Sequence, residues 1–430
     1  MLAELVNASP RAGIIFEYPL GQLVRDLEPV MAYGRAHRSL RAIIGGAADA
    51  AASNDGVYYN RPKVGPLTRF PTQERFHTIV RGVVEASLAK RDLDVIGSKT
   101  PGSAGSTDPE MLEPYFPRIS YLYSMRNPLD TINSMLNRRN LTRLGADSWP
   151  WGDVTASIQE YRENVLVLLS HAAAYPDECF VVKYEDLVAD LDPTAQRVGD
   201  FLGLEFDYGA ASPLNENGYL RRKPGHTKLV LTADERAAIM DAFGGAIAAW
   251  NDKPLTGPAP SAAAALTDCV DRMRLDTKYS YAGIGGVRNF LGLGWSTLQE
   301  DGVWSNAKRA DLFCTVEQDG DYVLFAETSF YVPDPRPRLG ITLDVDGTEA
   351  FRGTFIASSA QELDATAGGL RVYSGDGRKG LVCGPLRLQA NRAHRLTFTI
   401  DDPRSPLEFG YSSDGRKVGV MLHSLLLTRA

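Results

Sequence analysis

The first half of the chain alternates between short apolar segments and longer amphipathic ones, and this alternation limits the fold more than any other feature. Apolar runs at residues 13–16, 94–97, 119–123 and 180–183 have the length of buried strands. Stretches with helical periodicity, such as residues 72–90, separate them. Strands that alternate with helices usually pair in parallel and are covered by their crossover helices. This half of the chain is therefore predicted to form an α/β domain around a parallel sheet.

A residue with useful chemistry lies at or just past the C-terminal end of each predicted strand. These residues are Glu17, Lys99, Arg126 and Tyr184. In a parallel sheet such ends meet at one edge, and ligands bind beyond that edge. The sequence therefore predicts a site there, because a purely structural arrangement would leave these polar residues at one edge without a purpose.

The third strand gives the strongest indication of anion binding. Arg126 ends it, Asn127 is suited to cap the helix that follows, and Pro128 suits its first turn. A guanidinium group beside a helix N-terminus, where backbone N–H groups lack partners, is suited to a phosphate. Ser134 lies two turns further on and can add a hydroxyl group. The alternative is that Arg126 pairs with a neighbouring loop and that Ser134 is a small packing residue.

The order of four segments resembles the sulfotransferases that use 3′-phosphoadenosine 5′-phosphosulfate (PAPS). RISYLYSMRNPLDTINSMLNRR resembles the motif that holds the 3′-phosphate, and DLDVIGSKTPG is similar to a strand followed by Lys-x-Pro. ECFVVKYEDLVAD, followed by a helix that ends in FLG, resembles a motif whose tyrosine lies near the adenine. SPRAGIIFEYPLG looks like the strand that carries a carboxylate in the tyrosylprotein and glycan branches of the family. The resemblance covers residues 1–255 and implies a P-loop-like fold.

The resemblance also implies roles for individual residues. Glu17 is the expected catalytic base, and Lys99 is expected to stabilise the transferred sulfuryl group. The residues expected to bind the donor PAPS are Arg126, Ser134, Tyr184, Arg222 and Lys223, the last two in the basic segment GYLRRKPGHTKL. The alternatives are a strand-end carboxylate bound to a backbone N–H group for Glu17, a solvated side chain for Lys99 and a solvated face for the basic segment.

The chain departs from the family at its N-terminus. The phosphate-binding loop of the Arg-Ser-Gly-Thr-Thr type, which holds the 5′-phosphosulfate, has no match in it. Met1 and Leu2 match the helix that follows this loop in the family. The resemblance therefore implies that the chain begins inside the family domain. Two explanations stay open, namely a start assigned downstream of the true one and a truncated, inactive transferase.

The composition and pattern of the sequence change after Trp250. The segment GPAPSAAAAL lies in residues 256–285, which are predicted to be a linker. Short alternating segments with turn signals then predict an antiparallel β-sandwich over residues 286–430. Its ends, GWSTLQEDGVWS and SPLEFGYSSDGRKVGV, resemble β-sandwich modules of bacterial polysaccharide glycosyltransferases. Trp295 and Trp304 could stack on sugar rings, but packing in the core or lid-like closure of the sandwich is the favoured interpretation.

The composition argues against several classes of partner. A net charge of −7 provides no basic footprint for nucleic acid, and no run of apolar residues is long enough to span a membrane. We therefore expect a cytoplasmic protein. The cysteines and histidines show no spacing typical of metal ligands or of a disulfide framework, so no metal is assigned.

The sequence thus predicts transfer of a sulfuryl group from PAPS to a hydroxyl group of a glycan or glycolipid, in bacterial surface-polysaccharide synthesis. Two alternatives stay open. One is a phosphoryl-transfer enzyme on the same scaffold, for which neither a Walker lysine nor a magnesium-binding aspartate is evident. The other is a non-catalytic glycan-binding or scaffold protein whose transferase domain has decayed.

Overall fold

The computed structural model describes most of the predicted elements. The described residues are 2–16, 73–99, 116, 118–137, 153–206, 231–283, 288–332, 338–356, 364–367, 374–375, 378–406 and 416–430. The chain forms two compact units. The first contains Met1–Pro101, Ser106–Ile119 and Leu202–Glu216, and the second contains Gly102–Gly105, Ser120–Phe201 and Asn217–Ala430.

The first unit contains a pair of parallel strands. Strand β1 (Ala12–Phe16) pairs with β2 (Val95–Lys99), and helices α1 (Leu2–Ala8) and α5 (Gln73–Leu88) pack on β1. A side chain at Gly13 would be too close to its neighbours, because a Cβ atom there would lie 2.5 Å from Cδ1 of Leu93. The same Cβ atom would lie 2.9 Å from Cδ1 of Leu88 in α5, so the missing side chain lets α5 lie close to β1.

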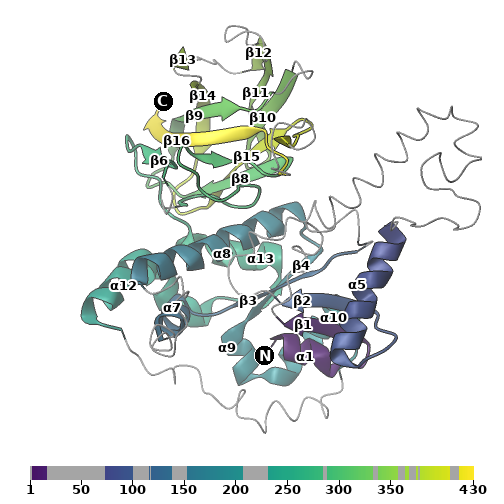
Figure 1. Ribbon diagram of the computed structural model, residues 1–430. Coiled ribbons are helices and arrows are strands. Elements are labelled where there is room, and N and C mark those ends of the chain that lie inside the picture. The colour runs from purple at the N-terminus through teal and green to yellow at the C-terminus, as the bar shows by residue number, and fades with distance from the viewer. Residues whose placement is uncertain are drawn as a thin grey trace, which may run out of the picture. The chain divides into compact units, whose positions relative to one another are not determined.

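The second unit begins with another pair of parallel strands. Strand β3 (Tyr121–Met125) pairs with β4 (Cys179–Lys183), and β5 (Gly257–Pro258) adds to β4 in the antiparallel direction. All residues of β4 are buried, as expected for a central strand. The helices are α7 (Pro128–Asn137), α8 (Val154–Ala174), α9 (Tyr184–Ala189), α10 (Leu191–Leu202), α12 (Ala233–Ala248) and α13 (Ala259–Ala265), with 3₁₀ turns at Trp250–Asp252 and Thr267–Cys269 (Figure 1).

The helices of the second unit combine polar caps with apolar faces that pack together. Asp153 caps α8 by accepting a hydrogen bond from the N–H group of Ala156, and Thr232 and Glu235 form a reciprocal capping box at α12. The apolar faces of α7, α8, α12 and α13 bury a common core that includes Trp250. This core supports the strand ends described below.

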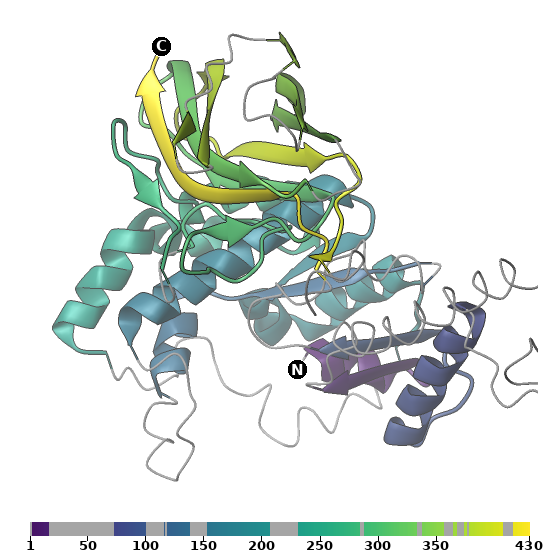
Figure 2. The same cartoon turned by 45° about the horizontal axis from the view of Figure 1, so that its top comes forward.

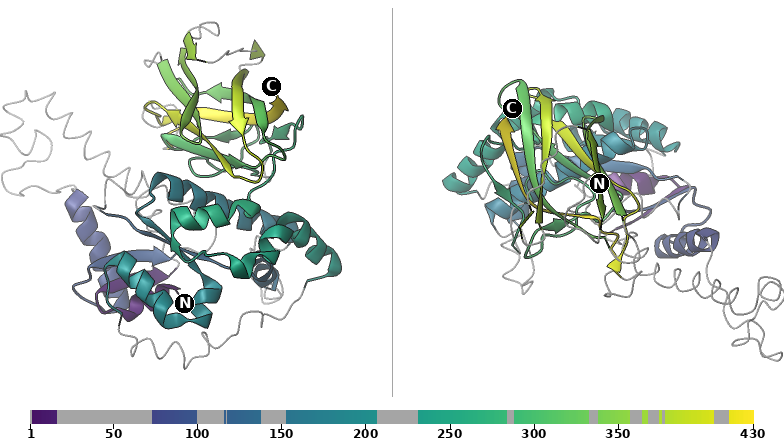
Figure 3. Two further views of the ribbon diagram at one scale, coloured as in Figure 1. Left: turned by 180° about the vertical axis from the view of Figure 1, so that it is seen from behind. Right: turned by 90° about the horizontal axis from the view of Figure 1, so that it is seen from above.

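The rest of the second unit is a β-sandwich of two antiparallel sheets. One sheet has the order β12-β11-β10-β15-β8, and the other has the order β13-β14-β9-β16-β6, with β7 paired to β16. Figures 2 and 3 show β16 in yellow, ending at the C-terminus. The strands are β6 (Tyr279–Ser280), β7 (Val303–Trp304), β8 (Arg309–Cys314), β9 (Gly320–Phe330), β10 (Arg338–Val345), β11 (Thr348–Ile356), β12 (Asp364–Ala367), β13 (Ser374–Gly375), β14 (Arg378–Leu388), β15 (His394–Ile400) and β16 (Val420–Arg429).

The predicted linker over residues 256–285 contains regular structure. Strand β5, helix α13 and strand β6 lie within it, and β6 pairs with β16 of the sandwich. Ala259 and Ala262 of α13 are fully buried in the core shared with α8. The segment therefore packs against both the helices and the sandwich of the second unit.

The predicted fold class is confirmed. The chain combines α/β elements, whose strands are joined by helices and pair in parallel, with an antiparallel β-sandwich. The sequence placed the third strand at residues 119–123, whereas β3 runs from Tyr121 to Met125. None of the helices in the described ranges is long and apolar enough to cross a membrane.

Candidate functional site

In the first unit, the C-terminal ends of β1 and β2 lie side by side. Phe16, the last residue of β1, is directly opposite Lys99, the last residue of β2. Lys99 is exposed to solvent at this edge. Glu17 follows Phe16 in the chain but lies outside the described residues. The register thus places Lys99 next to the strand that leads to Glu17, while the roles of both residues remain predictions.

In the second unit, Arg126 and Tyr184 occupy equivalent places after β3 and β4. Met125 and Lys183, the last residues of these strands, are directly opposite each other. Arg126 and Tyr184 follow them, and the guanidinium carbon of Arg126 lies 4.8 Å from the centre of the Tyr184 ring. This is the distance of a cation–π contact. The structure therefore brings together two of the residues that the sequence predicted to bind the donor.

The Arg126 side chain also forms an ion pair within its own segment. Its Nη2 atom lies 3.5 Å from Oδ2 of Asp130, and both side chains are about four-fifths buried, with exposed fractions of 22% and 20%. Ser134, which is half-buried, lies one helical turn beyond Asp130 on the same face of α7. The helix thus places Ser134 next to Asp130, the ion-pair partner of Arg126. Sequence analysis did not identify Asp130, although its spacing from Arg126 is typical of a helical ion pair.

The backbone at the start of α7 differs from the predicted arrangement. The sequence suggested that N–H groups without partners would be available for a phosphate. Instead, the N–H group of Asn127 donates to Oε1 of Glu185 at 3.0 Å, and the N–H group of Leu129 donates to Oδ1 of Asn127 at 2.9 Å. Pro128 has no N–H group. Anion binding at this turn therefore depends on side chains more than the sequence suggested.

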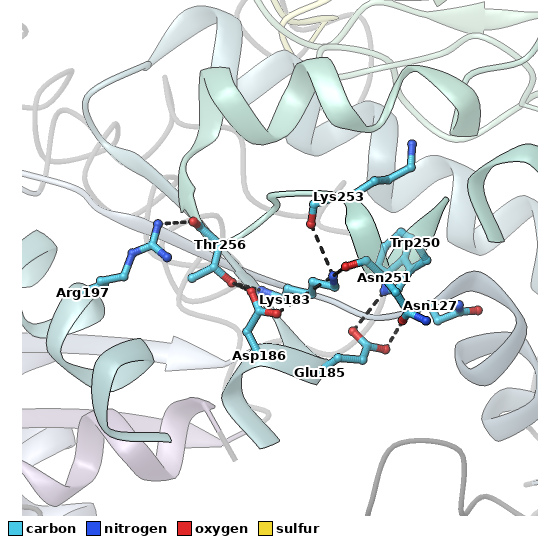
Figure 4. A network of polar contacts seen from close by, with 9 residues as sticks. All are labelled: Asn127, Lys183, Glu185, Asp186, Arg197, Trp250, Asn251, Lys253 and Thr256. Atoms are coloured by element: carbon cyan, nitrogen blue, oxygen red, sulfur yellow. Dashed lines mark hydrogen bonds and ion pairs between the residues drawn. The ribbon is translucent and has the colours of Figure 1, made fainter. Parts of the chain in front are cut away.

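A polar network fixes the turn between β4 and α9 (Figure 4). Oε2 of Glu185 accepts a hydrogen bond from the indole N–H of Trp250 at 3.1 Å. The ammonium group of Lys183, whose side chain is 4% exposed, donates to the carbonyl oxygens of Asn251 at 3.0 Å and Lys253 at 3.3 Å. These contacts join β4 and α9 to the segment after α12.

Thr256 extends the same network. Its hydroxyl group donates to Oδ2 of Asp186 at 2.6 Å and accepts the N–H of Lys183 at 3.0 Å, and its carbonyl oxygen accepts from Arg197. The sequence indicated the Tyr-Glu-Asp motif, but the partners of its two acidic residues are distant in the chain. The local signal of this network was a lysine at the end of an apolar run, two residues before the acidic pair.

Other predicted residues lie outside the site or outside the described ranges. Arg222 and Lys223 are not among the described residues. Trp295 is 4% exposed, donates its indole N–H to the carbonyl oxygen of Asp311 at 2.8 Å and packs on Phe398, so it belongs to the sandwich core. Trp304 is half-buried and contacts Tyr331 edge to face.

The cysteines and His171 have structural surroundings. All the cysteines are buried, and burial raises the pKa of each thiol to about 12. His171 is buried among tyrosines, and burial lowers its pKa to about 3. Within the part of the chain that the structure describes, three or more potential metal ligands do not gather at any point.

Comparison with known proteins gives one family. A model described as "Sulfotransferase family" matches residues 57–208, a range that contains Lys99, Arg126, Ser134 and Tyr184. This match supports sulfuryl transfer by that part of the chain. No curated protein matches the sequence.

Similar solved structures include three of different kinds. The sulfotransferase domain from the curacin biosynthetic pathway has 19% identity and a TM-score of 0.27, and the match covers 38% of this chain and 66% of that chain. The mosquito-larvicidal Cry4Aa toxin from Bacillus thuringiensis has 12% identity, a TM-score of 0.19 and coverages of 30% and 19%. CsCBM6-3 from Clostridium stercorarium, solved with cellobiose, has 8% identity, a TM-score of 0.19 and coverages of 36% and 88%. The chain thus spans less than two thirds of the toxin and of the sulfotransferase domain.

Proposed function

We propose that the protein transfers the sulfuryl group of PAPS to a hydroxyl group of a glycan or glycolipid. The observation that carries this proposal is the position of Arg126, which is fixed on the Tyr184 ring at the end of β3, within the range that matches the sulfotransferase family. An arginine held in one place by a ring and by an ion pair presents a preformed fork for a phosphate.

In this proposal Arg126 binds the 3′-phosphate of the donor. The guanidinium group has five N–H donors, and its Nη2 atom lies 3.5 Å from Oδ2 of Asp130. In the proposed complex this guanidinium fork donates to oxygens of the 3′-phosphate. Ser134, on the same helical face as Asp130, adds a hydroxyl donor, and Tyr184 lies beside the adenine.

The chemical step needs a base, a charge-stabilising group and in-line placement of the acceptor. We assign the base to Glu17, which removes the proton from the acceptor hydroxyl as its oxygen attacks sulfur. The bond between sulfur and the bridging phosphate oxygen breaks, and adenosine 3′,5′-bisphosphate leaves. Lys99, opposite the last residue of β1, stabilises the negative charge on the sulfuryl group and on the leaving oxygen.

A glycan acceptor is supported by the sandwich. Trp304 is half-buried and lies edge to face with Tyr331, and an indole ring is suited to stack on a sugar ring. We propose a place for the reaction in bacterial surface-polysaccharide synthesis, and a cytoplasmic location because the donor nucleotide is made in the cytosol.

The experiment that tests the proposal follows ³⁵S from labelled PAPS to a panel of oligosaccharide and glycolipid acceptors. Transfer that depends on the protein and on Lys99 supports the assignment. If ³²P from γ-labelled ATP is transferred instead, a phosphoryl-transfer enzyme is the better description. If the protein binds oligosaccharides but not adenosine 3′,5′-bisphosphate, the glycan-binding alternative is favoured.

A further inference from the structure

The peptide bond between Arg126 and Asn127 is held from both sides. Its carbonyl oxygen accepts a hydrogen bond from the Tyr161 hydroxyl at 2.9 Å, and its N–H group donates to Oε1 of Glu185 at 3.0 Å. Burial raises the pKa of Tyr161 well above its usual value, so this phenol remains a donor around neutral pH. Because a peptide bond is planar, these two hydrogen bonds hold the plane that contains the Cα atom of Arg126, from which its side chain leaves the backbone.

Glu185 satisfies a second donor at the same time. Its Oε2 atom accepts the indole N–H of Trp250 at 3.1 Å, and Trp250 is 1% exposed. Both partners of Glu185 are N–H groups, which donate and cannot accept. A carboxylate can accept both hydrogen bonds, because each of its two oxygen atoms accepts one. A glutamine would satisfy one donor and direct its own N–H₂ group at the other.

The charge of Glu185 does not by itself favour an anion nearby. With Asp130, it places a second carboxylate close to Arg126. Removing a negative charge should therefore strengthen phosphate binding if electrostatics alone decided the outcome. A role in geometry makes the opposite prediction, and this difference can be measured.

We propose that Glu185 is a positioning residue, which directs Arg126 toward the 3′-phosphate of the donor by accepting the backbone N–H of Asn127 and so holding the Arg126–Asn127 peptide in place. This inference rests on the proposed function, because it assumes that Arg126 binds that phosphate. The substitution Glu185→Gln keeps the size of the side chain and removes one acceptor. It should lower the preference for the 3′-phosphate although it also removes a negative charge.

The test compares two ligands by calorimetry, adenosine 3′,5′-bisphosphate and adenosine 5′-monophosphate. The dissociation constant of adenosine 5′-monophosphate divided by that of adenosine 3′,5′-bisphosphate measures recognition of the 3′-phosphate. This ratio cancels general effects on adenine binding. Glu185→Gln should reduce this ratio roughly tenfold, which corresponds to the loss of a charge-assisted contact. An unchanged or increased ratio would overturn the inference.

A second substitution provides a rescue that a merely structural role would not produce. Trp250→Phe removes the indole donor, so Glu185 still accepts the N–H of Asn127, and the ratio should stay within about twofold of the wild type. In the double variant the glutamine has only Asn127 to satisfy. The ratio should therefore recover relative to Glu185→Gln alone. A double variant as impaired as Glu185→Gln contradicts the inference. If Glu185→Gln alone does not fold, the double variant is compared with Trp250→Phe, and a ratio about tenfold below that of Trp250→Phe contradicts the inference.

The matched control is Glu235→Gln. Glu235 also accepts a backbone N–H group, that of Thr232 at 2.8 Å, at the exposed start of α12. It should leave the ratio unchanged. If the wild-type protein itself shows no preference for the 3′-phosphate, the proposed function fails. If the wild type and Glu185→Gln share the same strong preference, only the positioning role fails.

Discussion

The hydroxyl group of Ser170 on α8 accepts a hydrogen bond from the backbone N–H of Leu293 in the sandwich at 3.0 Å. Two ion pairs accompany it, because Arg162 contacts Asp271 at 2.7 Å and Glu163 contacts Arg288 at 3.5 Å. The side chains that form these two ion pairs are about four-fifths buried. Helix α8 therefore contributes to the core of the α/β elements and contacts the sandwich directly.

The close contact between Ser170 and the sandwich requires glycine at position 292. A Cβ atom there would lie 2.5 Å from Oγ of Ser170 and 3.2 Å from the carbonyl oxygen of Asp311. We expect Gly292→Ala to lower the free energy of unfolding by about 1–3 kcal/mol, the usual effect of overpacking. Denaturant unfolding followed by tryptophan fluorescence measures this change.

Gly245 supplies the matched control for this substitution. It lies in α12, and a Cβ atom added there meets nothing within 4 Å. Gly245→Ala should raise stability by about 0.5–1 kcal/mol, because alanine favours a helix over glycine. Equal effects of the two substitutions would contradict the close packing of α8 on the sandwich.

The buried imidazole of His171 makes stability depend on pH. Burial lowers its pKa from 6.5 to about 3, so between these values the unfolded chain binds a proton that the folded chain does not. Stability must therefore fall as the pH drops below about 6.5. From pH 7.5 to pH 5 this group alone should remove about 2 kcal/mol from the free energy of unfolding.

The measurement compares the wild type with His171→Gln over this pH range. Other titrating groups contribute to both proteins and cancel in the difference between them. The variant is expected to lose the component of pH dependence that corresponds to one proton. If the two curves are parallel between pH 7.5 and pH 5, His171 titrates normally and is not buried as described.

The strands and the positions of the site residues at their ends could be predicted because they depend on local pattern. An apolar run followed by a polar residue defines a strand end, and the register that places Arg126 beside Tyr184 follows from parallel pairing of β3 and β4. The partners of Glu185 could not be predicted in this way. Asn127 and Trp250 are 58 and 65 residues away from it, and no local pattern encodes such contacts.

The Ala-rich segment after β5 shows a different limit of sequence analysis. Composition suggested a linker because proline, glycine and small residues are common in linkers. Alanine also favours helices and permits close packing, and Ala259 and Ala262 use both properties in α13. Composition does not distinguish a solvated alanine from a buried one, so only the contacts with α8 reveal the difference.

Arg126→Ala should weaken binding of adenosine 3′,5′-bisphosphate by about 2–4 kcal/mol, because it removes a charge-assisted contact in a site shielded from water. Adenosine 5′-monophosphate, which lacks the 3′-phosphate, should lose much less affinity. Calorimetry with both ligands measures these changes. An equal loss for both would assign Arg126 to adenine binding or to the fold.

Arg352→Ala is the control for the loss of an arginine. Arg352 pairs with Glu349 on the exposed surface of the sandwich, where ion pairs contribute little to stability. Its substitution should change neither affinity. A similar loss with Arg352→Ala would show that the net charge of the protein, and not the Arg126 site, determines nucleotide affinity.

Glu17→Gln tests the base assigned to the chemical step. Glutamine has nearly the same size but cannot accept the proton of the acceptor hydroxyl, so turnover should fall by roughly 100-fold to 10,000-fold. Binding of adenosine 3′,5′-bisphosphate should stay near that of the wild type, because in the proposed mechanism Glu17 contacts the acceptor and not the 3′-phosphate. Sulfuryl transfer from labelled PAPS and calorimetry separate these two effects. Wild-type turnover in Glu17→Gln would move the base to another residue, whereas a loss of nucleotide affinity without a loss of turnover would place Glu17 on the donor side of the reaction.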